Sequence, residues 1–399
     1  MYENSRYQIA ILDPQGCGLH ATLERTLIRE AAELGLDPQR ALDFLGPDNV
    51  DARSTRDPIV GVYRGGRLQN DACTQALQTL RDAGADILPL VDDLKTYPQS
   101  VPSVLHPING LQLDPGDAEL RVPASRIFEM LRLMRSQRRL FISYRRTQSR
   151  EVAVQLYYLL QERRFDVFLD THGVQTGDAF QEELGQRLLD ADVMIFLDTS
   201  GATASEWVRK EIEIANALAI GVLQVIFPRP PAPDGRLDRA RFTELCEPLE
   251  LGEAEFAGSD LQREGGEPLK DDVLTRIALR VEGLRARSTA ARRARLTSRL
   301  LAALTDKTLR SPPRYEVEPG RYVTVHRSSG DCRVFPQIGV VDSPCLHRAE
   351  MDAEKLPVAV LYDPTGLRDE SQRHLDWLCR YAKIAPISLL NTEQWVSAG

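Results

Sequence analysis

The sequence predicts an α/β protein in which a central domain with a parallel sheet is flanked by N- and C-terminal α/β segments. Two observations predict this class. Short apolar runs alternate with amphipathic stretches along most of the chain, which is the pattern expected when helices cover both faces of a parallel sheet. In addition, 399 residues are too many for one ordinary hydrophobic core, so we expect two or three domains.

Composition narrows the class of protein. With 42% hydrophobic and 27% charged residues, the chain is typical of a water-soluble globular protein. Its longest apolar runs, such as Val193 to Leu197, are far shorter than the roughly 20 residues that cross a bilayer, and the N-terminus lacks the pattern of a signal peptide. We therefore expect a cytoplasmic protein. The net charge of -8 argues against general nucleic-acid binding, and six cysteines without a CxxC pair predict neither a disulfide framework nor a zinc site.

The first segment, residues 1–115, is predicted to form an α/β domain that serves as a sensor or a scaffold. Three β-like runs alternate with two amphipathic stretches: 8–12, 22–34, 59–63, 72–83 and 87–91. Prolines 98, 102 and 107 then interrupt the pattern, and a helix over 126–136 is expected to lead into the next domain.

The alternation is clearest in the central segment, and we place a domain at residues 137–228. The expected strands are 140–142, 167–169, 193–197 and 222–227, and the expected helices are 152–162, 180–189 and 207–219. Apolar strands in strict alternation with amphipathic helices predict a parallel sheet covered on both faces.

Residues 229–312 are predicted to be a connector. The run Pro228 to Gly235 contains four prolines, which cannot continue a helix or a central strand, so it is expected to close the central domain. A helix over about 271–309 follows, rich in arginine, and it is interpreted as a solvated connector in preference to a nucleic-acid-binding arm. The last segment, 313–399, is expected to be α/β, with strands at 358–362 and 387–390 around a helix at 371–381.

Polar side chains follow the strands of the central domain, at the sheet edge where open parallel sheets bind ligands. Ser143, Arg145 and Arg146 follow the first strand, and a hydroxyl with two guanidinium groups suits a phosphate or diphosphate, although adjacent arginines are also common surface charges. Asp170 to Gly177 follows the second strand and is either a lid or a passive connection. Ser200 follows the third strand, where small polar groups can also simply cap a turn.

The fourth polar element is Ser205 to Glu211. If Ser205 caps a helix, Trp207 and Glu211 stand four residues apart and share one helix face. An aromatic surface beside a carboxylate suits a nucleoside with a positive charge. The alternative is a core tryptophan beside a solvated glutamate that pairs with a surface base such as Arg209.

Four segments in this order resemble Toll/interleukin-1 receptor (TIR) domains, in particular the bacterial NAD-cleaving type. They are Leu140 to Arg146, Asp166 to Asp170 with Gly177 and Phe180, Asp190 to Leu197 with Ser200, and Trp207 to Glu211. The resemblance implies a flavodoxin-like parallel sheet. It also implies Glu211 as the catalytic carboxylate, with Ser143, Arg145, Arg146, Asp170, Gly177, Ser200 and Trp207 around the bound substrate.

The activity implied by this resemblance is that of an NAD⁺ glycohydrolase or cyclase, a hydrolase that uses NAD⁺ as substrate and needs no cofactor or metal. Such enzymes work when assembled side by side, so we expect self-association into a homo-oligomer or filament, and an activating partner that the sequence does not identify. In a bacterium, this architecture resembles an antiphage effector that depletes NAD⁺. Two alternatives stay open: a TIR scaffold without turnover, and an enzyme acting on nucleosides. The segment His172 to Gln175 departs from the family pattern, which puts the geometry of assembly in doubt.

Overall fold

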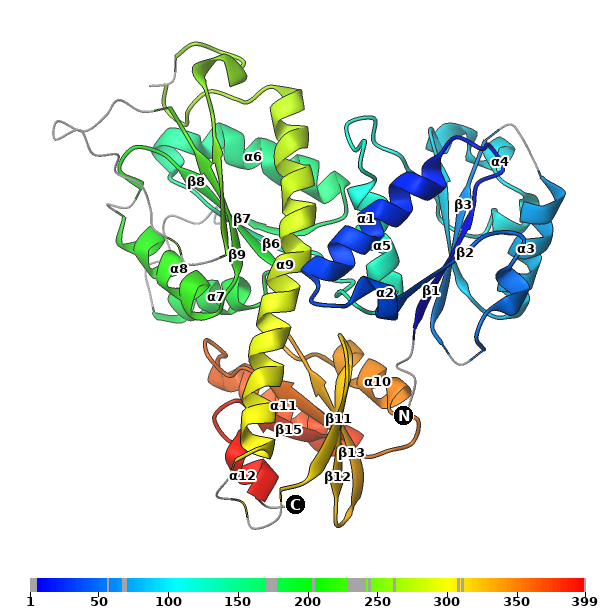
Figure 1. Cartoon of the computed structure of the whole chain (residues 1–399). Helices are drawn as coiled ribbons and strands as arrows, with labels where there is room; N and C mark the ends of the chain where they lie inside the picture. The colour runs from blue at the N-terminus through cyan, green and yellow to red at the C-terminus, as the bar shows by residue number, and fades with distance from the viewer. Residues whose placement is uncertain are drawn as a thin grey trace. The chain divides into compact units, whose positions relative to one another are not determined.

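The computed structural model describes residues 6–55, 57–66, 70–169, 178–202, 205–228, 242, 245–260, 263–306, 309 and 312–397, with only the backbone for 178–183 and Trp207. The chain divides into two compact units, Met1–Ser136 and Gln137–Gly399. The described residues form three five-stranded sheets, one in the first unit and two in the second (Figure 1). Among these residues, no helix is both long enough and apolar enough to cross a membrane.

The first unit is a parallel sheet of strand order β2-β1-β3-β4-β5. Its strands are β1 (Tyr7–Leu12), β2 (Leu42–Leu45), β3 (Ile59–Arg64), β4 (Asp86–Val91) and β5 (Leu111–Gln112). Its helices are α1 (Leu19–Glu33), α2 (Pro38–Ala41), α3 (Asp71–Asp82), α4 (Tyr97–Ser100) and α5 (Arg121–Met130). Helix α3 packs into the core on one face of the sheet, and α1 and α5 contact each other.

The three predicted strands and two predicted helices of this unit are confirmed, but the sequence did not indicate β2 and β5. These two strands are short and lie at the sheet edges, where little apolar pattern is required. The helix expected over 126–136 is displaced, since α5 begins at Arg121 and ends at Met130. Pro123 is the third residue of α5. A proline in the first turn of a helix costs no hydrogen bond, so the helix can begin before it.

The central sheet of the second unit is parallel, with strand order β10-β9-β8-β6-β7. Its strands are β6 (Arg139–Ser143), β7 (Asp166–Leu169), β8 (Val193–Asp198), β9 (Gly221–Ile226) and β10 (Cys246–Glu250). Its helices are α6 (Arg146–Glu162), α7 (Asp178–Leu189) and α8 (Glu206–Ala217). Numbered within the domain, this order is 2-1-3-4-5, so the expected flavodoxin-like sheet is confirmed.

The central sheet extends past the proline-rich run that was expected to close it. Strand β10 pairs in parallel with β9, with Leu249 and Leu251 buried in the domain core. Residues 229–241 lie outside the described part of the chain. The domain therefore ends later than the predicted boundary at residue 228. A chain can leave a sheet through a proline-rich segment and return to its edge.

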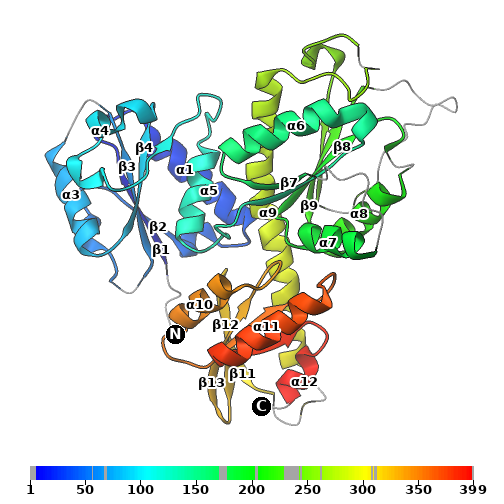
Figure 2. The same cartoon turned by 180° about the vertical axis from the view of Figure 1, so that it is seen from behind.

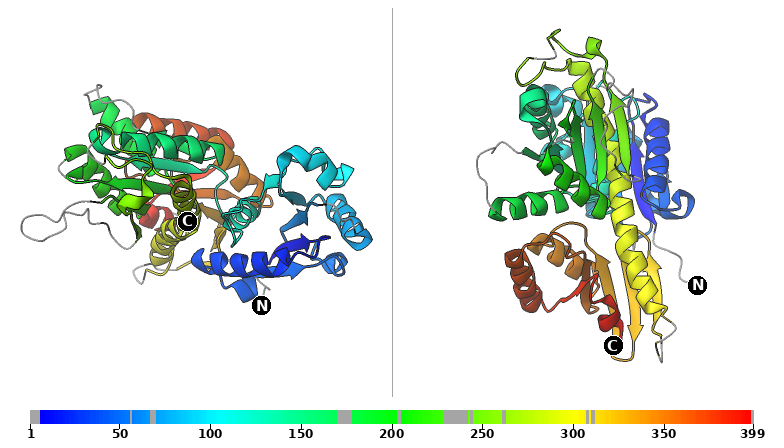
Figure 3. Two further views of the ribbon diagram at one scale, coloured as in Figure 1. Left: turned by 90° about the horizontal axis from the view of Figure 1, so that it is seen from above. Right: turned by 90° about the vertical axis from the view of Figure 1, so that its left-hand side faces the viewer.

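Helix α9 (Asp271–Leu304) corrects the expectation of a solvated connector. Its first half contributes Val273, Ile277 and Val281 to the core of the central domain, beside α6. Its second half contributes Leu296 and Leu300 to the core of the C-terminal domain. Figure 3 shows α9 running past both sheets. The many arginines of this segment led to the expectation of a solvated helix. The apolar residues between them recur at helical spacing, and two different domains bury the faces that they form.

The C-terminal domain has strand order β11-β12-β13-β14-β15, antiparallel from β11 to β13 and parallel from β13 to β15. Its strands are β11 (Arg314–Glu318), β12 (Tyr322–Arg327), β13 (Gly330–Pro336), β14 (Val358–Tyr362) and β15 (Ala385–Ser388). Its helices are α10 (Ser343–Asp352), α11 (Asp369–Ala382) and α12 (Thr392–Ser397). Helices α9 and α12 cover one face, and α10 and α11 cover the other (Figure 2).

Candidate active site

The carboxyl ends of β6 and β8 place polar side chains side by side in the middle of the central sheet. Ser143 is the last residue of β6 and Asp198 is the last residue of β8, and both are buried. Side chains alternate between the faces of a strand, so these two share the face of Phe141 and Phe196, which α7 and α8 cover. This is the switch point at which the strand order reverses, where doubly wound sheets bind ligands.

Helix α8 brings Glu211 to this edge. Ser205 occupies the N-cap position of α8, but its side chain makes no capping hydrogen bond. Val208, Ile212 and Ala215 pack into the core, so the helix face that includes Glu211 is turned towards the sheet. Glu211 is only 5% exposed, which excludes the alternative of a solvated glutamate on the helix surface.

The hydroxyl of Ser143 donates a hydrogen bond to Oε2 of Glu211, and both residues are buried. This contact joins two of the predicted site residues that are 68 positions apart in the chain. A carboxylate in such a low-dielectric setting acts more strongly on a nearby positive charge than it would in water. The pair can therefore stabilise a cation that develops at this sheet edge.

Arg145 and Ser200 lie at the same edge. The guanidinium of Arg145 approaches the backbone carbonyl oxygens of Ser200, at 3.4 Å, and Gly201, at 3.3 Å. Ser200 thus contacts Arg145 through its backbone. Arg145 is exposed and Arg146, which begins α6, is half-buried. Both arginines thus follow β6 closely, after Ser143.

A pair of glycines that the sequence reasoning missed holds the first turn of α6. The Gly265 amide donates to the Thr147 carbonyl at 3.0 Å, and the Glu151 amide donates to the Gly265 carbonyl at 3.0 Å. A Cβ on Gly266 would stand 2.2 Å from the backbone oxygen of Gln148, so no larger residue fits there without movement. The adjacent glycines of the sequence were a visible signal, but only the tertiary structure shows what they approach.

A second buried polar group lies beneath this edge. Nε2 of Gln224 donates to Asp198 at 2.6 Å, and the Cys246 thiol lies 3.5 Å from Oε1 of Gln224. Burial, and after it the negative charge of Asp198, raise the pKa of Cys246 to about 11. This shift disfavours the thiolate, which is the nucleophilic form of a cysteine.

Three predicted site residues fall on parts that the structure does not describe in full. Asp170 and Gly177 lie outside the described residues. Trp207 is in the first turn of α8, four positions before Glu211, and its side chain is likewise outside the description. Among the described residues, no group of three or more His, Cys, Asp or Glu side chains could hold a metal ion.

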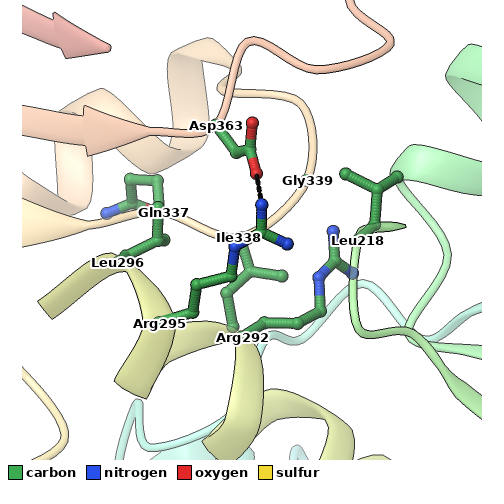
Figure 4. A pocket seen from close by; sticks show the side chains of 8 residues that line it. All are labelled: Leu218, Arg292, Arg295, Leu296, Gln337, Ile338, Gly339 and Asp363. Carbon is green, nitrogen blue, oxygen red and sulfur yellow. Dashed lines mark ion pairs between the residues drawn. The ribbon is translucent and has the colours of Figure 1, made fainter. Parts of the chain in front are cut away.

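Two hollows of the second unit lie away from Glu211. One is a small pocket where α9 meets the C-terminal domain, in which Arg295 points towards Asp363 and forms an ion pair with it at 3.4 Å (Figure 4). The other is a cleft of about 540 Å³ between α7 and the start of α11. Its lining residues are Gly185, Gly366, Leu367, Arg368, Asp369, Glu370 and Arg373.

Comparison with known proteins identifies one segment. Residues 140–253 match the family model of the TIR domain, a match that includes β10. No curated protein matches the chain. Among solved structures, the chain is similar to an ABC transporter solute-binding protein from Bacillus halodurans C-125 with bound myo-inositol, at 11% identity over 57% of this chain and 77% of that one, with a TM-score of 0.18. It is also similar to a transcriptional regulator CelR–cellobiose complex, at 14% identity over 57% and 69% of the two chains, with a TM-score of 0.18. Scores this low carry no argument about fold or function.

Proposed function

We propose that this chain, whose residues 140–253 form a TIR domain, cleaves the bond between nicotinamide and ribose in NAD⁺, with Glu211 as the catalytic carboxylate. The observation that carries the proposal is the buried Glu211 carboxylate, held by the Ser143 hydroxyl at the carboxyl edge of the sheet. TIR domains include non-catalytic scaffolds as well as NAD-cleaving enzymes, so the proposal rests on this residue and its setting more than on the fold.

The chemistry suits one buried carboxylate. When the bond from the ribose carbon to the nicotinamide nitrogen breaks, its electron pair moves to that nitrogen, and nicotinamide leaves as a neutral molecule. No strong general acid is therefore required. The ribose gains oxocarbenium character, and Glu211 stabilises this positive charge while holding the ribose hydroxyls. Water then adds and loses a proton to give ADP-ribose; attack by the adenine ring of the same nucleotide gives a cyclic isomer instead.

The neighbouring residues have proposed roles that follow from their chemistry. Ser143 orients the Glu211 carboxylate through its hydrogen bond. Arg145 and Arg146 bind the diphosphate, for which paired guanidinium groups are well suited. Trp207 packs on the nucleotide, Ser200 lines the pocket, and the segment from Asp170 to Gly177 closes over it. In this proposal the substrate is NAD⁺, and no cofactor or metal takes part.

The proposed biological setting is a bacterial antiphage effector that acts in the cytoplasm. Side-by-side self-association of TIR domains would complete the site, and NAD⁺ depletion would halt growth of the infected cell. The flanking domains would then sense an activating partner or control assembly.

The test is nicotinamide release by the purified full chain at rising protein concentration, followed by chromatography of the products. We expect activity that rises faster than linearly with protein concentration. Glu211→Gln should reduce it by at least about 100-fold, the usual cost of removing one group that stabilises transition-state charge. Glu213→Gln is the matched control, because Glu213 is exposed on the same helix; its activity should equal that of the wild type.

Two outcomes would contradict the proposal. If the wild-type chain releases no nicotinamide at any concentration, the scaffold function takes its place. If nucleosides are cleaved and NAD⁺ is not, the enzyme belongs to a different substrate class.

A further inference from the structure

Helix α11 covers one face of the C-terminal sheet (Figure 2). It carries a stripe of exposed aromatic side chains, formed by His374, Trp377 and Tyr381. Trp377 is 51% exposed and Tyr381 is 76% exposed. Their ring centroids lie 5.0 Å apart, and His374 stacks on Trp377 at 5.9 Å with an interplanar angle of 18°. The opposite face of α11 already packs Leu375 and Cys379 into the core. The stripe is therefore apolar surface that the fold of one chain does not use.

Charged residues lie beside Trp377 on this face of the helix. Glu370, Arg373, Trp377 and Arg380 stand at i, i+3, i+7 and i+10, so they form one row along α11. All four are exposed, and Glu370 and Arg373 also line the open cleft beside α7. In the part of the chain that the structure describes, neither Arg373 nor Arg380 lies in an ion pair, and Glu370 has only a loose contact of 3.7 Å with Arg368. The face combines tryptophan, tyrosine and arginine, the residue types that dominate protein interfaces.

The charges along α11 are self-complementary. Asp369 and Glu370 lie in its first turn, and Arg380 and Lys383 lie at its end. A two-fold axis makes residue i contact residue j and residue j contact residue i. In an antiparallel pair centred midway between residues 370 and 380, Glu370 faces Arg380 of the second copy, and Arg373 faces Trp377 of the second copy. The first contact is an ion pair and the second a cation–π contact, and each occurs twice.

We propose that this face of α11 binds a second copy of the same chain, with the two α11 helices antiparallel. The aromatic stripe supplies the apolar centre, and the charges at the two ends of the helix set the direction and register. This dimer does not depend on NAD⁺ chemistry or on contacts between TIR domains. One helix pair buries less surface than a standard interface, so the association is reversible, with a dissociation constant on the order of micromolar.

Sedimentation velocity of the full chain over a wide concentration range tests the proposal. The wild-type chain should shift from monomer to dimer as concentration rises, and Trp377→Ala with Tyr381→Ala should weaken this dimerisation at least about tenfold, with nicotinamide release per chain, measured in parallel, reporting separately on assembly through the TIR domain. Glu370→Arg alone, or Arg380→Glu alone, should weaken dimerisation at least about tenfold, because like charges then face each other at two symmetric places. Combining the two reversals restores opposite charges and should restore the dimer.

Controls separate this surface from other causes. Glu253→Arg makes the same change of charge as Glu370→Arg at an exposed position outside α11. It should leave dimerisation unchanged. Thermal unfolding of each variant checks that it folds. A chain that stays monomeric at every concentration would overturn the proposal, as would a dimer that survives the two alanine substitutions or a double reversal no better than either single one. None of these results depends on whether the chain cleaves NAD⁺.

Discussion

The N-terminal sheet and the central sheet have the same strand order, yet the carboxyl ends of their inner strands carry different chemistry. At the end of β3, Arg64 donates to both carboxylate oxygens of Asp92 at 2.8 Å and to the Gly65 carbonyl at 2.5 Å. A cation and an anion there neutralise each other. At the end of β6, the neutral hydroxyl of Ser143 donates a hydrogen bond to the carboxyl group of Glu211. The shared fold supplies the edge, and the side chains at the strand ends decide what it can do.

The two domains also differ in how they treat buried charge. At the amino end of the central sheet, Arg138 donates to Glu282 of α9, and Arg285 of α9 donates to Asp192 at 3.2 Å. The four side chains are at most 2% exposed. In the N-terminal domain, by contrast, Asp92 is 76% exposed, so water screens its pair with Arg64. In the central domain, a buried group of charges therefore joins α9 to the amino end of the sheet.

The largest expected effect is on the free energy of unfolding, when one carboxylate of each ion pair is removed. Glu282→Ala leaves Arg138 and Arg285 with their charges inside the protein, and we expect it to cost about 3–5 kcal/mol of unfolding free energy. Asp92→Ala should cost about 1 kcal/mol, because the exposed carboxylate is already hydrated. Chemical denaturation of both variants measures the difference. Equal costs would show that burial does not distinguish the two pairs.

A second prediction concerns the buried carboxyl group of Glu30 in the N-terminal domain, whose effect on stability should depend on pH. Burial raises the pKa of Glu30 in α1 to about 7, an effect that Glu33 adds to and Arg121 and Arg29 oppose. Between pH 4.5 and 7 the unfolded chain loses this proton before the folded chain does, so rising pH lowers the stability. The full loss, present above pH 7, is on the order of 3 kcal/mol.

Glu30→Gln should therefore match the wild type in thermal stability at acidic pH and exceed it at pH 8. It should leave nicotinamide release unchanged, in contrast to Glu211→Gln. A variant whose advantage over the wild type is the same at both pH values would contradict this account of Glu30.

The smallest effect concerns the hydroxyl that holds Glu211. Ser143→Ala removes one hydrogen bond from the carboxylate, and we expect kcat for NAD⁺ to fall about tenfold, with a smaller change in KM, since the worth of such a bond is about 1.5 kcal/mol. Ser288→Ala is the control, because Ser288 is also buried and accepts a hydrogen bond from the Gly221 amide at 3.0 Å. Steady-state kinetics should show a change in the first variant alone. A similar fall in kcat in both would assign Ser143 a purely structural role.

Much of the candidate site was visible in local pattern. Ser143 stood at the end of an apolar run, and Glu211 followed a plausible helix start, so both could be assigned to the carboxyl edge of the sheet before their contact was known. Gln224 gave no such signal, because a glutamine inside an apolar strand does not reveal that it reaches Asp198. Gly266 could not be assigned a role from the sequence, since the backbone oxygen that it approaches belongs to Gln148, 118 positions earlier in the chain.

By itself, the sequence determined the alternation of strands and helices, the central parallel sheet and the polar residues at its strand ends. Periodicity carries this information because it reports which face of each element avoids water. Only the tertiary structure decided that β10 returns to the sheet, that α9 belongs to two cores and that Ser143 meets Glu211. The reason is physical: local pattern states that a face is buried, whereas the partner that buries it lies far along the chain and is selected by packing of the whole domain.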